Sequence, residues 1–546
     1  MKMQKLLLLP TVSSATSTGF PTATISSGQI QGIPTSRPNA ITPVNKFLGV
    51  PYATIPERFS LPHPPKPWID TFKATAFGPA CLQNFGINGK IQLQLGPRLE
   101  VLQDLFNTPA PPESEDCLSV NIFAPATTRL PGDGLAVVVF IPGGGWQLGH
   151  GRLDLSVFAA YENIIAVTLN YRTNVFGFPA SPEIPLPEQN LGLHDQRLAL
   201  TWVQENIAAF GGDPSKVTIW GQSAGAFSVD HHLKAYANNA LVPFRAAIMS
   251  SGQMSFGHLA HSSPGIDAWT GLSRLVGCVN ATDELRCMRA VPAENLISAM
   301  RKFRITFGPQ FDNVTTLSKP SVLWRNGNVV RVPLLMGTVE EEGRGLVNDK
   351  VNMTAFFNAY LPPALISPED LETIVSLYRS DTRVKNDFDL ASAIYTDLLW
   401  SCPQSILAST AASNDISTWR YHFNTSILNL LPKEYDWLGK FHGSEIILLF
   451  TDPDTTPYTP QTYAAYEYLR GVVARFVKNP SVGPGWPAVG SSYAPLDVAV
   501  LGDVGDTSSA MTVSNSTAMN ERCKLFNTIW PKLEAIQRYA HSHGHR

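Results

Sequence analysis

The stretch Lys216-Val217-Thr218-Ile219-Trp220-Gly221-Gln222-Ser223-Ala224-Gly225 places a serine between two glycines at the end of an apolar run. It predicts a buried strand over Lys216–Trp220, a sharp turn, and a helix over Ala224–Ala235, because small residues let two backbones pass closely at such a turn. A serine held there projects from the N-terminus of a helix, where the helix dipole favours a developing negative charge. The five central residues form a weak pattern, but the flanking strand and helix make Ser223 a candidate nucleophile.

Apolar runs of the same kind alternate with helical stretches along the chain, which is typical of a mostly parallel sheet covered by helices. They are nearly continuous in Val, Ile and Leu, as in strands buried on both faces. The further expected strands are Leu118–Phe123, Ala136–Ile141, Ile164–Asn170, Ala246–Ser250, Val332–Gly337 and Thr418–Phe423. The further expected helices are Leu193–Ala209, Tyr463–Val477 and Ala518–Ala540. No repeat or linker divides the chain, so we predict one α/β domain with its chemistry beyond the carboxyl ends of the strands.

A serine hydroxyl is a poor nucleophile and needs a base, which is held in turn by an acid. Three consecutive glutamates, Glu340–Glu342, follow the expected strand Val332–Gly337, and His442 stands further on in Phe441-His442-Gly443. The order serine, acid, histidine is the one expected when the nucleophile sits on this type of turn. The pattern leaves the choice among the three glutamates open.

Acyl transfer also needs donors for the negative charge that forms on the carbonyl oxygen. Pro142 and then three glycines, Gly143–Gly145, follow the expected strand Ala136–Ile141. They leave backbone N–H groups free to act together with the N–H of Ala224. A flexible loop is the alternative interpretation. This chemistry requires neither a metal nor a cofactor.

The composition excludes some functions and indicates a cellular location. The 546 residues carry a formal net charge of −3 without a long basic run, so nucleic acid is not expected as a partner. No internal run is long and apolar enough to cross a membrane. A basic start, an apolar run and small residues predict a secretory signal peptide over residues 1–18, with the domain over residues 19–546. A frayed apolar terminus is the alternative.

Two further features favour export of a secreted glycoprotein. The six cysteines are an even number, which suits an oxidising compartment. Asn-X-Ser/Thr sequons, each weak alone, stand at Asn280, Asn313, Asn352, Asn424 and Asn515.

From about Thr24 onward, the chain contains an ordered set of segments that chance does not produce. They are Phe47–Ala53 with Arg58-Phe59, Glu115–Ile122, Asn170–Phe178, Asn190–Arg197, and Gly211-Gly212-Asp213-Pro214 before the serine strand. In these segments the chain resembles the type-B carboxylesterase/lipase family, which includes the cholinesterases. The resemblance implies an α/β-hydrolase fold and an ester as substrate.

Matching to the family also implies roles for individual residues. The acid falls on Glu342, the glutamate before glycine, and the base falls on His442. The oxyanion hole falls on Gly144, Gly145 and Ala224, and supporting positions fall on Gln222 and Ser251. The implied disulfides are Cys81–Cys117, Cys278–Cys287 and Cys402–Cys523, and the implied structural ion pairs are Arg58–Glu115 and Arg172–Asp195.

Departures from the cholinesterase pattern bear on the substrate. The loop Leu82–Asp116 contains no Trp, and Gln222 stands before the nucleophile where cholinesterases have Glu. A cationic substrate would lose both its aromatic platform and its nearby charge, so choline esters are disfavoured. The loop also contains the apolar stretches Ile91–Leu95 and Leu99–Phe106, which suit either a lid over an apolar substrate or a packed surface loop.

We therefore expect a serine carboxylic-ester hydrolase that acts through an acyl-enzyme on uncharged small or medium esters. A lipase acting on acylglycerols and an acyltransferase or lactone-forming enzyme remain alternatives. A non-catalytic adhesion protein on the same fold is disfavoured, because Ser223, Glu342 and His442 are all present.

Overall fold

The computed structural model describes residues 19–85, 105, 109–127, 134–239, 241–256, 265–490, 497–502, 511–515 and 519–532. The expected signal peptide over residues 1–18 lies outside this range. So do the stretch Ile91–Leu95 and all of Leu99–Phe106 except Leu105.

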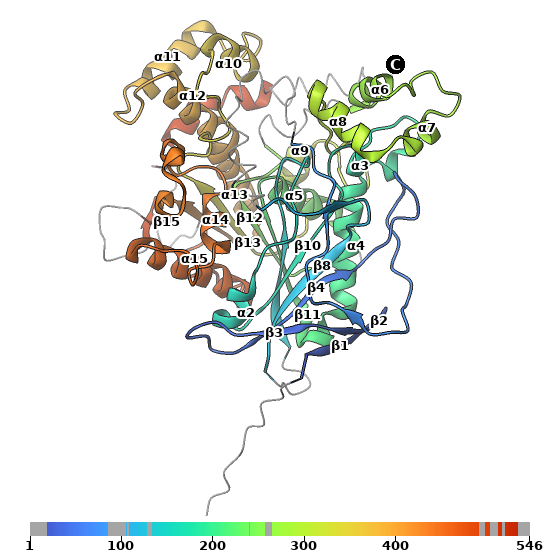
Figure 1. Ribbon diagram of the computed structural model, residues 1–546. Helices are drawn as coiled ribbons and strands as arrows, with labels where there is room; N and C mark the ends of the chain where they lie inside the picture. Colours follow the sequence, from blue (N-terminus) through green and yellow to red (C-terminus); the bar gives the residue numbers. More distant parts are fainter. Residues whose placement is uncertain are drawn as a thin grey trace, which may run out of the picture.

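A large sheet forms the centre of the molecule (Figure 1). Its strands in chain order are β3 (Ile33–Thr35), β4 (Val44–Pro51), β8 (Ser119–Pro125), β9 (Leu135–Ile141), β10 (Ile165–Leu169), β11 (Gly212–Gln222), β12 (Ala246–Ser250), β13 (Leu334–Val339), β14 (Thr418–Phe423), β15 (Val498–Leu501) and β16 (Met511–Ser514). Their spatial order is β16-β15-β14-β13-β12-β11-β9-β10-β8-β4-β3. Neighbours from β15 to β10 pair in parallel, whereas the pairs at the two edges are antiparallel. The prediction of a mostly parallel sheet is confirmed.

Two small sheets lie outside the large one. They consist of β1 (Thr22–Ile25), β2 (Gly28–Gln31) and β5 (Phe72–Lys73), and of β6 (Ala80–Cys81) and β7 (Glu113–Ser114).

Helices cover both faces of the large sheet. The α-helices are α2 (Ser156–Glu162), α3 (Asn174–Gly177), α4 (Leu191–Asn206), α5 (Ala224–Ala235), α6 (Gly265–Leu275), α7 (Glu284–Ala290), α8 (Ala293–Phe303), α9 (Pro320–Arg325), α10 (Met353–Tyr360), α11 (Pro368–Arg379), α12 (Asp387–Thr396), α13 (Cys402–Ser413), α14 (Ser444–Phe450) and α15 (Pro460–Lys478). A π-helical segment, η5 (Asp397–Ser401), joins α12 to α13. The 3₁₀ turns are η2 (Leu186–Glu188), η3 (Ile207–Phe210), η6 (Leu428–Leu430), η7 (Lys433–Leu438) and η8 (Glu521–Phe526).

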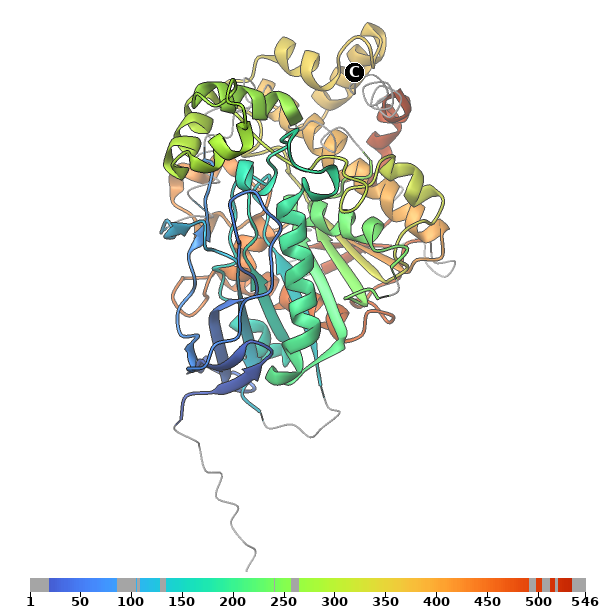
Figure 2. The same cartoon turned by 90° about the vertical axis from the view of Figure 1, so that its right-hand side faces the viewer.

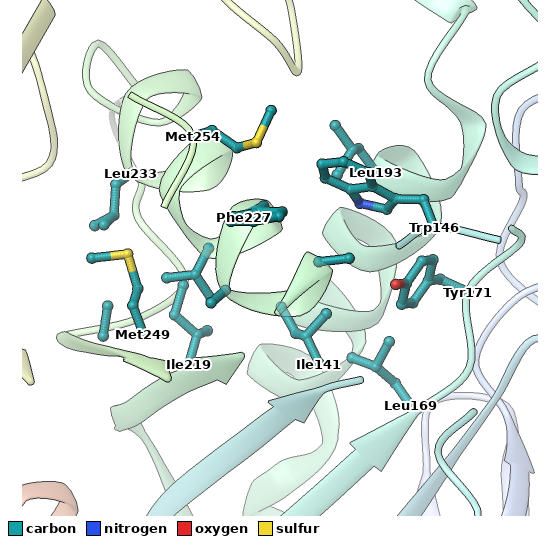
Figure 3. Packing of buried hydrophobic residues seen from close by; sticks show 14 of the residues in the cluster. Ile141, Trp146, Leu169, Tyr171, Leu193, Ile219, Phe227, Leu233, Met249 and Met254 are labelled. Atoms are coloured by element: carbon teal, nitrogen blue, oxygen red, sulfur yellow. The ribbon is translucent and has the colours of Figure 1, made fainter. Parts of the chain in front are cut away.

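Side chains alternate between the two faces along each buried strand. In β9, Val139 and Ile141 belong to the cluster that packs α4, α5 and α13, whereas Val138 and Phe140 belong to the cluster that packs α2, α14 and α15. Figure 2 shows α4 lying across the first of these faces, and Figure 3 shows the strand residues Ile141 and Ile219 pointing toward α5, which carries Phe227. Burial on both faces explains why the strands read as unbroken apolar runs.

The observed strands differ from the predicted ones mainly at the edges of the sheet, whereas among the α-helices the prediction located only α4, α5 and α15. Strands β12 and β14 and helix α5 have the predicted bounds, but the prediction missed the edge strands β3, β4, β15 and β16. The short strand β15 has only four residues, and β4 contains Gly49 and ends at Pro51, so neither has a long apolar run. The predicted helix Ala518–Ala540 is wrong where η8 replaces it, and residues 533–540 lie outside the described range.

The order of the strands decides where chemistry is possible. Strand β10 lies on one side of β9 and the later strand β11 lies on the other, so the connections leave β9 in opposite directions. Such a switch point opens a crevice at the carboxyl ends of the strands. The residues that follow β9 and β11 are therefore neighbours there.

The structure contains three disulfides, Cys81–Cys117, Cys278–Cys287 and Cys402–Cys523, which are the expected pairs. The two expected ion pairs are present as well, with 2.6 Å between Arg58 and Glu115 and 2.7 Å between Arg172 and Asp195.

The disulfides differ in the length of chain that they close. Cys402–Cys523 spans 121 residues and Cys278–Cys287 spans 9, and in each pair the first cysteine is fully buried and the second is half-buried. A longer closed loop removes more entropy from the unfolded chain. Replacing Cys402 and Cys523 by serine should lower the free energy of unfolding by about 2 kcal/mol more than replacing Cys278 and Cys287. Equal losses in urea unfolding of the two double variants would contradict this expectation.

Candidate active site

Ser223 lies at a strained turn between β11 and α5. Its backbone has φ +53° and ψ −124°, a conformation that is unfavourable for a residue with a side chain. The turn is held because the N–H of Ser223 donates to the carbonyl of Ser250 on the neighbouring strand, at 3.0 Å. A β-carbon on Gly221 would overlap the backbone of Gly225, and one on Gly225 would overlap the carbonyl of Ile141. Both glycines are thus required by close backbone approach, as the sequence pattern predicted.

The triple-glycine loop lies directly against this turn. A β-carbon on Gly143 would be 2.6 Å from the carbonyl oxygen of Gln222 and 2.9 Å from Cβ of Ser223. Gly144 and Gly145 have φ values of +112° and +61°. Among the described residues, no acceptor is found for the backbone N–H groups of Gly144, Gly145 and Ala224. Three unpaired donors beside one hydroxyl are what an oxyanion hole requires.

Glu342 and His442 form a buried pair. The Nδ1–H of His442 donates to Oε2 of Glu342 at 2.6 Å, while Oε1 of Glu342 accepts from the N–H of Val339 at 2.8 Å. The glutamate is fully buried and the histidine is 6% exposed. Two loops meet here because Glu341 and Phe441 form a parallel bridge, with the N–H of Glu341 donating to the carbonyl of Lys440. Residues 100 positions apart are thereby held in contact.

The three adjacent glutamates have different partners in the structure. Burial alone would raise the pKa of Glu340, but hydrogen bonds and charge from His422 and Arg383 lower this pKa to about 2. Glu341 accepts from Arg344 at 2.8 Å and from the N–H of Lys440 at 2.8 Å. Only Glu342 among them reaches His442.

Gln222 contacts the other nitrogen of the same imidazole. Because Nδ1 donates to Glu342, Nε2 of His442 is left as an acceptor, and Nε2 of Gln222 lies 3.4 Å from it. Within the described part of the chain, no hydrogen bond joins Oγ of Ser223 to His442. Such bonds are often long without substrate and tighten when it binds, so the arrangement still permits proton transfer.

Glu445 is a buried carboxyl that the sequence analysis did not single out, although it stands three residues after His442. Its Oε1 accepts from Oγ of Ser251 at 3.3 Å, so Ser251 contacts this carboxyl rather than the imidazole. Burial, with the charge of Glu342 as a second cause, raises the pKa of Glu445 to about 8. At neutral pH Glu445 is therefore mostly protonated, which keeps a second negative charge away from the Glu342–His442 pair.

The described residues contain no group of three or more His, Cys, Asp or Glu side chains that could hold a metal ion. No helix among them is long and apolar enough to span a membrane.

A strained serine, a buried histidine–carboxylate pair and unpaired N–H groups at a switch point of a parallel sheet are features of serine hydrolases with an α/β-hydrolase fold. The model of the Carboxylesterase family matches residues 20–495. The chain belongs to this family, and it is an ester hydrolase.

Its relatives include both lipases and an esterase. "Lipase 2" of Diutina rugosa is 33% identical over 491 residues, covering 82% of this chain and 85% of the relative. "Lipase 2" of Geotrichum candidum is 32% identical, with 74% and 80% covered. "Para-nitrobenzyl esterase" of Bacillus subtilis (strain 168) is 32% identical, with 88% and 95% covered. Among solved structures, "PNB ESTERASE" matches with a TM-score of 0.71 and 29% identity, covering 93% of this chain and all of the other.

The raised pKa of Glu445 predicts how the stability of the protein depends on pH. The folded protein keeps the proton up to about pH 8, whereas the unfolded chain loses it near its usual value of 4.5. Because the folded state binds more protons between these values, this group makes stability fall as pH rises from 4.5 to 8. Glu445→Gln removes that dependence, so the Tm of the variant should rise relative to wild type between about pH 5 and about pH 8.5.

The exposed Glu434→Gln is the matched control and should track wild type at every pH. Parallel melting curves of Glu445→Gln and wild type across this range would show that Glu445 does not titrate as inferred.

Proposed function

We propose that this ester hydrolase acts on uncharged carboxylic esters through an acyl-enzyme, with Ser223 as nucleophile, His442 as base and Glu342 as its acid. The observation that carries the proposal is the buried 2.6 Å hydrogen bond from His442 to Glu342, beside a serine in a strained turn. Burial of both partners keeps the imidazole in one tautomer, with Nε2 free to accept a proton.

The steps follow from these positions. Oγ of Ser223 attacks the ester carbonyl while Nε2 of His442 takes the hydroxyl proton, and Glu342 stabilises the imidazolium. The N–H groups of Gly144, Gly145 and Ala224 donate to the oxyanion of the tetrahedral intermediate. The imidazolium then gives its proton to the alkoxide, the alcohol leaves, and an acyl-serine remains. Water, deprotonated by His442, attacks the acyl group, and collapse of the second intermediate releases the acid and restores Ser223.

Two observations support an uncharged substrate. The residue next to the nucleophile is the neutral Gln222, whose amide already contacts His442. The loop Leu82–Asp116 has no Trp to bind a cation. Acylglycerols are the second candidate class, because two of the relatives above are named lipases. A rate that rises once a triglyceride exceeds its solubility would favour the lipase, and a rate that saturates below it favours the esterase.

Ser223→Ala should lower kcat/KM for p-nitrophenyl butyrate by about 10⁴-fold or more. His442→Ala should cost a similar factor, and the double variant should lose no more than either single one, because the two residues act as a unit. The exposed helical Ser409→Ala serves as control and should keep wild-type activity. Hydrolysis by Ser223→Ala at the wild-type rate would disprove the mechanism.

Secretion after removal of residues 1–18 is part of the same proposal. It is supported by the three disulfides, which persist in oxidising compartments. The sequon residues Asn280, Asn313 and Asn352 are exposed, whereas Asn424 is half-buried and accepts from Nζ of Lys440 at 2.6 Å. Asn515 is half-buried.

Glycans should therefore attach at the exposed sequons before the half-buried ones. In protein secreted from a fungal host, Asn280→Gln, Asn313→Gln and Asn352→Gln should each reduce the intact mass by one glycan, and Asn424→Gln should not. An intact mass unchanged by glycosidase treatment would count against both glycosylation and export.

A further inference from the structure

Trp400 lies against the imidazole of His442. Their ring centroids are 4.5 Å apart and the ring planes are tilted by 45°. The indole is 5% exposed, and among the described residues its N–H has no hydrogen-bond acceptor. Because no hydrogen bond accounts for a tryptophan here, the contact between the rings is the interaction that the indole makes with the site.

The indole is held firmly in this position. Its other neighbour is Phe227, one helical turn after Ser223, whose ring stacks at 5.7 Å with an interplanar angle of 17°. Trp400 belongs to the π-helical segment η5, and π-helical turns are rare and often occur at functional sites. The segment is fixed at its start by a 2.6 Å bond from the hydroxyl of Tyr378 to Asp397, and just after its end by the disulfide of Cys402.

The imidazole is enclosed by few polar groups. Glu342 lies at Nδ1 and the amide of Gln222 lies at Nε2. The carboxyl of Glu445, paired with Ser251, comes from the following helix α14. Trp400, from η5, contributes an apolar but electron-rich surface. An aromatic ring within about 6 Å attracts a cation through its quadrupole, and the attraction is larger where water is excluded.

We propose that Trp400 is a positioning residue for the reaction, holding the imidazole of His442 against Glu342 and favouring the imidazolium that forms in both transition states. This inference rests on the proposed function, in which His442 is the general base. The proton that leaves Ser223 binds Nε2 of His442 and later leaves with the alcohol. The Trp400 ring therefore stabilises the imidazole of His442 only while that imidazole carries the extra proton. This stabilisation lowers the activation free energy of the reaction and leaves substrate binding unchanged.

The test compares Trp400→Leu, which keeps the site apolar, with Trp400→Phe, which keeps an aromatic ring. Trp400→Leu should lower kcat by about fivefold to thirtyfold, with KM changed by less than about threefold. Because the charged imidazole is less favoured, the acidic limb of its kcat/KM profile should move to lower pH by about half a unit or more. Trp400→Phe should restore most of kcat and return the limb to the wild-type position.

Trp269→Leu is the matched control. Trp269 is buried as well, and its indole N–H also lacks an acceptor among the described residues, but its ring packs against Phe59 and not against His442. This variant should lose thermal stability without moving the pH profile. All rates are divided by the concentration of active sites, titrated with a phosphonate ester, so that poor folding does not count as slow turnover.

An acidic limb that stays in place or moves to higher pH in Trp400→Leu would overturn the inference. So would a Trp400→Phe variant as slow as Trp400→Leu. In either case the proposed function still stands if wild type hydrolyses the ester and Ser223→Ala does not. If Ser223→Ala is as active as wild type, the proposed function itself fails.

Discussion

The structure depends on the close approach of three backbone segments at one point. There is no room for a β-carbon at Gly225, because the carbonyl of Ile141 at the end of β9 occupies that space. A β-carbon on Gly143 would likewise overlap the carbonyl of Gln222 and Cβ of Ser223. Strand β9, strand β11 and helix α5 therefore meet without side chains between them. The strained conformation of Ser223 persists because this contact, and its hydrogen bond to Ser250, leave the backbone no alternative.

The rest of the site is brought to this point by the sheet. Parallel pairing from β9 to β14 aligns the carboxyl ends of the strands, so the loops that follow β9, β11 and β13 share one edge. The loop that contains His442 does not directly follow a strand of the sheet, so a separate contact must hold it in place. The bridge between Glu341 and Phe441 provides this contact, and each neighbouring residue, Glu342 and His442, then points into the same buried space. Burial makes this polar contact strong, since water does not compete for it.

The part of the site that could be predicted from sequence consists of residues whose position follows from local sterics. The strand, turn and helix around Ser223 and the glycines after β9 are of this kind. The choice of Glu342 among three glutamates was different, because it came from resemblance to a family and not from the residues themselves. Its physical reason is visible only in the structure, where His422 and Arg383 engage Glu340 and Arg344 engages Glu341. Glu445 and Trp400 were not predicted, because nothing in their local sequence indicates which side chains will surround them.

By itself the sequence determined the fold class, the sharp turn at Ser223 and the chain order of Ser223, Glu342 and His442, since these depend on apolar periodicity, on glycine sterics and on chain order. The tertiary structure decided which distant groups share a low-dielectric space. Glu342 and His442 are 100 residues apart, Trp400 is 42 residues before His442, and Glu445 titrates near pH 8 because the folded protein excludes water from it. Hydrogen-bond geometry and desolvation act over a few ångströms in space, so no spacing along the chain can encode them.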